Sequence, residues 1–515
     1  MAGGADELKL LATWFSPFAS RVMFVLHLKG LSYENIEEDL KNKSELLLKS
    51  NPMHKKVPVL FHNGKPLCES MVIVEYIEEA FAGVGPAVVP ADPYERAIAR
   101  FWVNYIDNKL VAPWFQVFRS KTMEEKAEGL KQMTVAAATL ENAFEECSKG
   151  RPFFGGDAVG IIDIALGCQV GWMRASAALS GISIFDPAKT PLLMAWAERF
   201  TALDAARASM PEFDRLLAYA KMRQAESDAA NKFRSNIWNN VRSDNEKYCT
   251  AQQHHAIIQS PGQTCINHPA SSIRAKMARC HELKLLGTWM SPYVIRVRLA
   301  LSLKALSYEY VEQDIRDKSE LLVVSNPVHK KVPVLIHAGK PVCESQIIVQ
   351  YLDEAFAGAA RLLPSDPYER AVARFWAAYI DDEVFASRFR AMGEAKEEEK
   401  AEAAEKVFDA LETLEEAMKA CSSKGKKEEE EAAAAFFGGD SAGYVDVALG
   451  GFLGWLKATE ALSGVSFLDG ARTPLLAAWA ARFAALDATK EAIPSVERLC
   501  EFHAAMSAAA EVAGN

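Results

Sequence analysis

Short apolar runs and longer amphipathic stretches alternate along this chain, and the whole pattern occurs twice. The first apolar run begins at Leu8 and is followed by Ser16-Pro17, after which apolar residues recur with a helical period through Leu28. The pattern predicts a strand that leads directly into a helix, with Ser16 at the junction. The same arrangement returns 275 residues later, with Ser291 at the corresponding junction.

The chain after this junction continues as a small α/β unit. A strand is predicted at residues 32–36, a short helical segment begins at Lys43, a hairpin follows around Asn63-Gly64, and helical spacing resumes after Ser70. The predicted order is β-α-β-α-β-β-α, in which crossover connections give parallel strand pairs and the hairpin gives an antiparallel edge. The polar residues repeated in both copies fall at helix starts or in turns, where ligands can reach them.

From residue 92 onward the pattern is helical. Asp92 precedes Pro93 at the first helical position, with Glu95 three residues on, which is a reciprocal capping arrangement. Pro113 lies inside the helical pattern of copy 1 alone, so we expect a kink there. Later helices are predicted at about 124–147, 161–179 and 191–204, and at the corresponding positions of copy 2.

Two aspartates of the helical units, Asp163 and Asp446, each open an apolar run. A carboxylate at such a position stabilises the first turn of its own helix. We therefore interpret both as buried helix caps and not as catalytic acids.

The pattern indicates a tandem duplication of a two-domain unit, and not a solenoid of short repeats. Between the copies the amphipathic period is lost and Asn, Ser, Gln and His gather, which predicts a linker. The fold class is α/β plus all-α, present twice. The expected boundaries are an α/β domain at 1–85 and a helical domain at 90–225 (copy 1), a linker at 226–281, and an α/β domain at 282–360 and a helical domain at 364–515 (copy 2).

Two segments have no counterpart in the repeat. A charged insert at 424–435 occurs in copy 2 alone and is expected to be a solvated loop or helix extension. The linker holds several cysteines and histidines, but their spacing matches no standard zinc finger, so no metal is expected. These residues are Cys249, His254, His255, Cys265, His268, Cys280 and His281.

Composition narrows the class of protein. With 515 residues, 50% of them hydrophobic, the chain is expected to form several globular domains. Its formal net charge of -10 argues against binding to nucleic acid or to an anionic membrane. No apolar run approaches the ~18–20 residues of a membrane span and the N-terminus does not resemble a signal peptide. Nine cysteines without a Cys-x-x-Cys pair suit a reducing compartment, so we expect a cytosolic protein.

The junction serine has two interpretations. Ser is a favoured N-cap and Pro a favoured first helical residue, so Ser16-Pro17 can simply be a well-formed helix start. A helix N-terminus also gathers unpaired N–H groups, and a hydroxyl beside it can donate a hydrogen bond to a bound anion. No His-Asp relay lies near either junction serine in the sequence, which disfavours a serine hydrolase. The hydroxyl is better suited to stabilising another nucleophile.

Several motifs, in the same order and spacing in both copies, together resemble the plant tau-class glutathione S-transferases. They are Ser-Pro-Phe/Tyr, Asn-Pro-x-His-Lys-Lys-Val-Pro-Val-Leu and Cys-Glu-Ser, followed by an all-helical half. The resemblance covers nearly all of both copies. It implies that each α/β domain is a thioredoxin-like, glutathione-binding domain and that each helical domain binds the electrophile. It further implies conjugation of the glutathione thiolate to hydrophobic electrophiles, in detoxification of xenobiotics and stress metabolites, with glutathione peroxidase activity as a minor one.

The resemblance also implies roles for single residues. Ser16 and Ser291 resemble the catalytic serine that hydrogen-bonds the glutathione sulfur, and the Val-Pro bonds after Val57 and Val332 resemble the bond that is cis in this fold. The implied glutathione site consists of Lys43, Lys56, Val57, Glu69 and Ser70 in copy 1, and of Lys318, Lys331, Val332, Glu344 and Ser345 in copy 2. The implied hydrophobic pocket is lined by Phe18, Phe115 and Phe118 in copy 1, and by Tyr293, Phe385, Phe389 and Met392 in copy 2.

The chemistry of these residues suits the tripeptide. Two lysines can meet the glycyl carboxylate, although without the resemblance they would be interpreted as solvent-facing charges. Ser70 with a helix N-terminus can hold the γ-glutamyl carboxylate, and Glu69 can pair with the α-amine. Lowering the thiol pKa from ~8.5 by about two units needs ~2.7 kcal/mol, which a charge-assisted hydrogen bond and a helix dipole can supply together. Related classes have cysteine at the serine position, so mixed-disulfide chemistry is not expected here.

The expected partners are glutathione as co-substrate and small hydrophobic electrophiles, with no other cofactor, no metal, no nucleic acid and no membrane. The two copies are expected to dock as an internal pseudo-dimer, or the chain to form a homodimer. Two alternatives stay open. A non-catalytic carrier of glutathione and apolar ligands would bind with little turnover, and a purely structural fusion would not be retained on immobilised glutathione.

Overall fold

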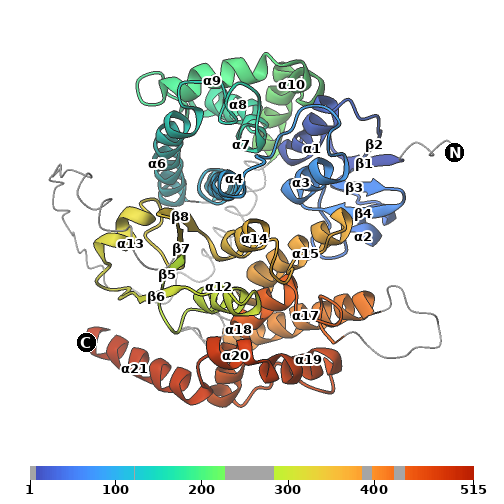
Figure 1. The fold of residues 1–515 in the computed structure, drawn as a ribbon. Helices are drawn as coiled ribbons and strands as arrows, with labels where there is room; N and C mark the ends of the chain where they lie inside the picture. The colour runs from blue at the N-terminus through green and yellow to red at the C-terminus, as the bar shows by residue number, and fades with distance from the viewer. Residues whose placement is uncertain (1–6, 121, 227–282, 386–396, 423–434, 515) are drawn as a thin grey trace, which may run out of the picture.

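The computed structural model describes residues 7–120, 122–226, 283–385, 397–422 and 435–514 (Figure 1). Two four-stranded sheets are present, with strand orders β2-β1-β3-β4 and β6-β5-β7-β8. The expected linker, with its cysteines and histidines, and the charged insert lie almost entirely outside the described residues.

The first α/β domain has the predicted order of elements, and the second repeats it. In copy 1 they are β1 (Leu8–Ala12), α1 (Pro17–Leu28), β2 (Glu34–Glu37), α2 (Glu45–Ser50), β3 (Val59–His62), β4 (Lys65–Cys68) and α3 (Ser70–Ala80). In copy 2 they are β5 (Leu283–Gly287), α12 (Pro292–Leu303), β6 (Glu309–Glu312), α13 (Glu320–Ser325), β7 (Val334–His337), β8 (Lys340–Cys343) and α14 (Ser345–Ala355).

The direction of the third strand corrects one prediction. β1 and β2 are parallel, as expected of the first crossover, but β3 is antiparallel to β1 and so is not part of a second parallel pair. The end of β2 and the start of β3 therefore lie at the same end of the sheet. The connection through the six-residue α2 does not have to cross the sheet, which a parallel crossover requires.

Strand β1 is buried on both faces of the first sheet. Its side chains point alternately to the two faces, and each face packs into a separate hydrophobic core. Leu10 packs in the large core with residues of α1 and α3, whereas Leu11 on the opposite face contacts a small cluster with Leu47 of α2 and Val59 of β3. α1 and α3 thus cover one face of the sheet and α2 the other. This arrangement fixes the helix starts relative to the strand ends.

The helical domains follow. In copy 1 the helices are α4 (Pro93–Tyr105), the π-helical η1 (Ile106–Val111), α5 (Ala112–Arg119), α6 (Met123–Ser148), α7 (Ile161–Gly167), α8 (Val170–Ser180), α9 (Pro191–Thr201), α10 (Asp204–Ser209) and a helix at 213–226. In copy 2 they are α15 (Pro367–Tyr379), η2 (Ile380–Phe385), α17 (Glu397–Ser422), α18 (Tyr444–Ser463), α19 (Pro474–Ala485), α20 (Asp487–Ala492) and α21 (Val496–Gly514). The single helix predicted at 161–179 is two helices in copy 1 and one, α18, in copy 2.

The distortion expected at Pro113 has a different cause. A π-helical segment interrupts the first long helix in both copies, although only copy 1 has the proline. Pro113 lies in the first turn of α5, where its missing N–H costs no helical hydrogen bond. Both π-helical segments contain an aspartate, Asp107 or Asp381, that pairs with a buried arginine of the α/β domain. The distortion therefore coincides with a contact between the domains.

The two buried aspartates are helix caps, as predicted. Asp163 is fully buried and accepts hydrogen bonds from the backbone N–H groups of Phe154, Gly155 and Gly160 and from the indole of Trp196, at 2.7–2.9 Å. Asp446 makes the corresponding contacts in copy 2. These carboxylates tie the loop before the helix to its first turn.

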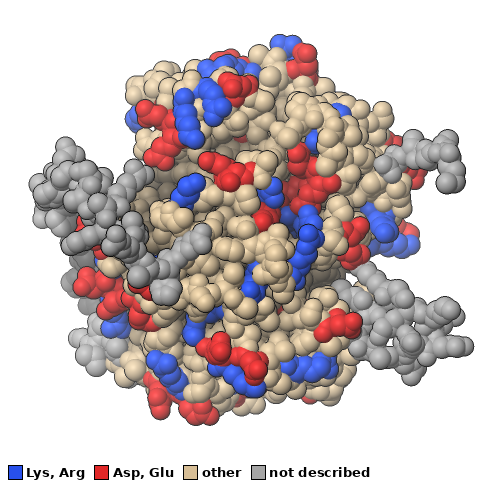
Figure 2. Space-filling model, viewed as in Figure 1, with Lys and Arg blue, Asp and Glu red and all other residues tan. Residues whose placement is uncertain are grey.

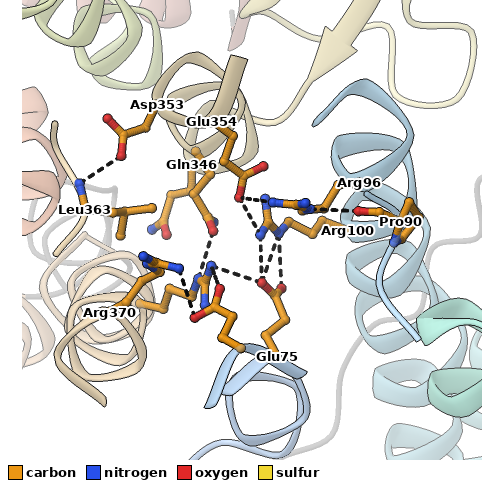
Figure 3. A network of polar contacts seen from close by, with 12 residues as sticks. Glu75, Pro90, Arg96, Arg100, Gln346, Asp353, Glu354, Leu363 and Arg370 are labelled. Atoms are coloured by element: carbon orange, nitrogen blue, oxygen red, sulfur yellow. Dashed lines mark hydrogen bonds and ion pairs between the residues drawn. The ribbon is translucent and has the colours of Figure 1, made fainter. Parts of the chain in front are cut away.

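The two copies pack against one another through their α/β and helical domains. α3 of copy 1 lies along α15 of copy 2, and α14 lies along α4 (Figure 1). Charged side chains fill the centre of this contact, where Arg100 lies between Glu75 of its own copy and Glu354 of the other (Figure 3). On the face of the molecule in Figure 2, acidic and basic side chains are interspersed and neither sign forms a broad patch.

Candidate active site

The pairing register of the first sheet brings three chain segments to one edge. β1 ends beside the start of β3, and β3 starts beside the end of β4. The segments that follow β1, precede β3 and follow β4 therefore meet there, and they carry Ser16, Val57-Pro58 and Ser70. The second sheet has the same register, so Ser291, Val332-Pro333 and Ser345 occupy the matching edge.

Ser16 caps α1 and is almost fully buried, with 8% of its surface exposed. Its Oγ accepts a hydrogen bond from Ala19 N at 3.2 Å, and in copy 2 the Oγ of Ser291 accepts from Val294 N at 3.4 Å. Because the oxygen accepts this bond, the hydroxyl hydrogen can be donated to a ligand atom at the helix N-terminus. The capping and ligand-binding interpretations of these serines are thus compatible.

The Asn-Pro-x-His motif shapes the segment before β3. The Val57-Pro58 and Val332-Pro333 peptide bonds are cis. The buried Asn51 side chain donates to Lys56 O at 2.9 Å and accepts from His54 N at 3.2 Å. This role of the asparagine was not predicted, although its fixed place before the lysines in both copies is a signal for it.

The start of α3 has an unusual backbone. Glu69 has a φ of 69°, and Glu344 has the same value in copy 2. Positive φ is uncommon for a residue other than glycine and concentrates at functional sites. It turns the chain sharply from β4 into α3, so that Ser70, the first helical residue, is buried at the helix N-terminus.

A buried arginine that was not among the predicted site residues hydrogen-bonds Ser70. Arg21 of α1 is 0% exposed, and its guanidinium donates to Ser70 Oγ at 3.4 Å, to the Asp107 carboxylate at 2.5 and 3.0 Å, and to Ala165 O at 2.8 Å. It therefore joins α1, α3, η1 and α7. Because Ser70 Oγ accepts from Arg21, its own hydrogen can be donated to a ligand.

The same arrangement exists in copy 2. Arg296 donates to Ser345 Oγ at 2.9 Å, to Asp381 at 2.5 and 3.1 Å, and to Ala448 O at 3.1 Å. The repeat of an arginine within an apolar helix, 275 residues apart, is the signal that sequence reasoning could have used.

We expect Arg21→Gln to weaken glutathione binding in copy 1, because Ser70 loses the donor that orients its hydroxyl. In a chain that also carries Ser291→Ala, so that copy 1 alone is active, KM for glutathione should rise roughly tenfold, the effect of ~1.4 kcal/mol, with a smaller change in kcat. Steady-state kinetics measure this split.

The matched control is Arg174→Gln, which removes an exposed arginine of the same copy that pairs with Glu198 at the surface. Thermal unfolding of both variants separates a loss of structure from a loss of orientation. A fall in kcat with unchanged KM for the Arg21 variant would contradict the positioning role.

The predicted lysines and valines lie at the same edge. Val57 and Val332 are half-buried, and Lys43, Lys56, Lys318 and Lys331 are exposed. Lys43 immediately precedes Ser44, the N-cap of α2, and Lys56 immediately precedes Val57. An exposed position is what an ammonium needs in order to reach a carboxylate at the rim of the site.

The predicted pocket residues lie together in pairs. The rings of Phe18 and Phe115 are stacked, with centroids 6.1 Å apart, and those of Tyr293 and Phe385 meet at 5.2 Å. Phe385 is 3% exposed and stacks on Phe452 at 4.2 Å, so it belongs mainly to the core. The side chain of Phe118, and the residues Phe389 and Met392, lie outside what the structure describes.

Aromatic residues that were not predicted as part of the site hold the turn that carries the serine. The indole of Trp172 donates to Phe15 O at 2.7 Å, directly before Ser16, and the ring of Phe15 stacks on Tyr219 at 4.4 Å. In copy 2, Trp455 donates to Met290 O at 2.7 Å. The helical domain thus holds the turn that carries each serine.

The cysteines nearest the site are not poised to react. Burial raises the pKa of both Cys68 and Cys343 to about 12, with smaller contributions from the adjacent Glu69 and Glu344. Both thiols are therefore protonated at neutral pH and are poor nucleophiles.

Among the described residues, no group of three or more candidate ligands could hold a metal ion, and no described helix is long and apolar enough to cross a bilayer.

The sequence is similar to known proteins of one family. The family model for the glutathione S-transferase N-terminal domain matches residues 6–79 and 281–354, and that for the C-terminal domain matches 127–221 and 397–482. A probable glutathione S-transferase of Oryza sativa subsp. japonica, GSTU6, is 55% identical over 221 residues, which are 42% of this chain and 94% of that protein. Glutathione S-transferase U17 of Arabidopsis thaliana is 47% identical over 221 residues, covering 42% of this chain and 96% of its own length.

Among solved structures, the tau-class glutathione S-transferase of mango, Mangifera indica, is 49% identical, with a TM-score of 0.40, and covers 43% of this chain and 97% of its own. Each family model matches two separate regions, one in each copy. The chain therefore belongs to the glutathione S-transferase family, with plant tau-class enzymes among its relatives, and it carries the N-terminal and C-terminal domains of the family twice.

Proposed function

We propose that each copy binds one glutathione at the sheet edge and uses its junction serine to keep the glutathione sulfur deprotonated. The observation that carries this proposal is the repeated placement of two helix-start serines at one edge: Ser16 with Ser70, and Ser291 with Ser345. Such a pair offers a hydroxyl donor for the sulfur and a helix N-terminus for a carboxylate at the same sheet edge.

The proposed roles follow from position and charge. Ser70 and the N-terminus of α3 hold the γ-glutamyl carboxylate, Glu69 pairs with the α-amine, and Lys43 and Lys56 meet the glycyl carboxylate. The backbone of Val57 binds the cysteinyl part. Copy 2 repeats these roles with Ser345, Glu344, Lys318, Lys331 and Val332.

The reaction needs no group beyond the two substrates and these side chains. The thiol proton leaves to solvent, and the thiolate accepts a hydrogen bond from Ser16 or Ser291. A sulfur lone pair then forms a bond to an electrophilic carbon held by the aromatic side chains of the helical domain. In a displacement the leaving group departs with the bonding electrons, and in an addition the neighbouring atom takes them and is protonated.

Calorimetric titration of the full chain with glutathione tests the proposal. We expect two glutathione molecules per chain, and one per chain after the γ-glutamyl site of one copy is removed by Ser70→Ala together with Glu69→Ala. A wild-type stoichiometry of one or zero would contradict two working sites. Retained binding with no conjugation would instead favour the alternative of a non-catalytic carrier of glutathione and apolar ligands. No feature of the described residues supports that alternative.

We further propose that the two copies form an internal pseudo-dimer within one chain. The packing of α3 on α15 and of α14 on α4 supports it, together with the hydrogen bond from the Tyr368 hydroxyl to Pro66 O at 3.1 Å. Lys65 lies over the Tyr368 ring and Lys340 over the Tyr94 ring, so the contact is duplicated about a pseudo-twofold axis.

The domain boundaries, the cytosolic location and the absence of a further cofactor stay predictions.

A further inference from the structure

Each glutathione site lies against the helical domain of the opposite copy. The His54 ring of copy 1 contacts Phe375 and Tyr379 of α15, with ring centroids 5.7 and 6.2 Å apart. His329 of copy 2 contacts Phe101 and Tyr105 of α4, at 5.4 and 5.8 Å, which completes the reciprocal arrangement.

These histidines also adjoin the glutamates of the sites. His54 Nε2 is 3.9 Å from Glu69 Oε1, and His329 Nε2 is 3.9 Å from Glu344 Oε1. One imidazole ring therefore separates each proposed α-amine site from a helix of the other copy. The π-helical segments η1 and η2, which directly continue these helices, therefore adjoin the proposed sites.

The π-helical segments η1 and η2 differ in charge between the copies. One turn after Tyr105, copy 1 has Asn108-Lys109, and the corresponding residues of copy 2 are Asp382-Glu383. All four are exposed, and none belongs to the site residues that the repeated motifs indicate.

The charges of these segments interact with site residues of the opposite copy. At the copy 2 site, burial raises the pKa of Glu344 and lowers that of His329, and the charge of Lys109 from copy 1 lowers both. Burial raises the pKa of Asp382 of copy 2, and at the copy 1 site the charge of Glu69 raises it further while that of Lys56 lowers it. The two sites, whose own lysines, histidine and glutamate match one for one, thus receive opposite charges from the neighbouring copy.

We propose that Lys109 is a glutathione-binding residue of the copy 2 site, contributed across the interface, and that Asp382 and Glu383 are its acidic counterparts at the copy 1 site. The copy 2 site is then the tighter of the two for the anionic tripeptide. This inference rests on the proposed function, because it assumes that both sheet edges bind glutathione.

The sign of the effect follows from the ligand. Glutathione carries two carboxylates and one ammonium, so its net charge is negative, and ionisation of the thiol makes it more so. A nearby ammonium favours this ligand and nearby carboxylates disfavour it. At physiological salt, charges within about 8 Å are only partly screened, so a reversal of one charge should change affinity on the order of fivefold.

Single-serine chains separate the two sites. Ser16→Ala leaves copy 2 active, and Ser291→Ala leaves copy 1 active. We expect a KM for glutathione about fivefold lower in the Ser16→Ala chain, with the difference shrinking as salt is raised. Direct titration with glutathione should show the same order of affinities.

Charge reversal then tests the contribution across the interface. In the Ser16→Ala chain, Lys109→Glu should raise the KM of copy 2 about fivefold, whereas Lys109→Arg should not. In the Ser291→Ala chain, Lys109→Glu should leave copy 1 unchanged, and Glu383→Lys should lower its KM. Lys131→Glu, at an exposed position of α6, controls for net charge.

An unchanged KM of copy 2 in the Lys109→Glu chain, or a change in copy 1 instead, would overturn the inference while leaving the proposed function intact. A chain that binds no glutathione at either site would overturn the proposed function itself, and the inference with it. Because Lys109 is exposed, thermal unfolding should be unaffected by its substitution, which keeps the kinetic result interpretable.

Discussion

A chain that carries both Ser16→Ala and Ser291→Ala is expected to lose conjugation of glutathione to a chloronitroarene by two to three orders of magnitude while still binding glutathione. Removing one preorganised donor to a developing or bound anion typically costs about 10²–10³ in rate. The binding residues of both sites are unchanged in this chain. Initial rates and a calorimetric titration on the same preparation measure the two effects.

The controls separate catalysis from helix capping. Each serine also caps its helix, so the alanine variants should lose about 1 kcal/mol of stability for that reason alone. Thr122→Ala removes another N-cap, that of α6, whose Oγ1 accepts from Glu125 N at 3.2 Å. It should lose similar stability and keep its activity. Full activity in the double serine variant would contradict the proposed mechanism.

The second large effect is expected at the interface between the copies, where Glu75→Gln should destabilise the chain by about 3–5 kcal/mol. The Glu75 carboxylate accepts from Arg100 at 2.7–3.2 Å and lies 3.2 Å from Arg374 of the other copy (Figure 3). Both arginines are buried, and the amide would leave them short of a counter-charge. Denaturant unfolding of the variant and the parent chain measures the loss.

The charge of Glu75 should also make the free energy of unfolding depend on pH. Burial alone would raise the pKa of Glu75, but the Arg100 and Arg374 guanidiniums outweigh it and lower that pKa from 4.5 to about 2. A depressed carboxylate pKa stabilises the folded state above the unfolded-state pKa, and this contribution is lost as pH falls from about 4.5 to about 2. The shift corresponds to about 3 kcal/mol. Glu75→Gln should flatten the stability profile in that window.

The chain contains its own matched control. Gln350 occupies the position equivalent to Glu75 in copy 2, and Arg374 Nε donates to its Oε1 at 3.0 Å. Among the described residues, Nη1 of both Arg100 and Arg374 is buried without a hydrogen-bond partner. Gln350→Glu should therefore cost far less stability than Glu75→Gln. Equal losses for the two variants would show that charge balance does not govern this contact.

The order of elements and the junction serines could be predicted from the sequence because local patterns determine them. A run of apolar residues before Ser16-Pro17 is enough to indicate a strand and a helix start. The direction of β3 could not be predicted in this way, because the connection through α2, from Glu37 to Val59, is long enough either to cross the sheet or to return at the same end.

The rest of the site depends on contacts between distant segments. The repeat of an arginine at positions 21 and 296 marks the position in the sequence, but only the fold places Arg21 between Ser70 and Asp107. The proposed effect of Lys109 on Glu344 depends on which helix of one copy lies on the other, and a single sequence carries no pattern for such packing.

The ionisation state of bound glutathione tests the central claim most directly. Ultraviolet difference titration of the glutathione-bound chain should give a thiol pKa about two units below the ~8.5 of a free thiol, and the Ser16→Ala, Ser291→Ala double variant should shift it most of the way back. A bound thiol that titrates near its free value in the parent chain, or identically in the two chains, would contradict the account.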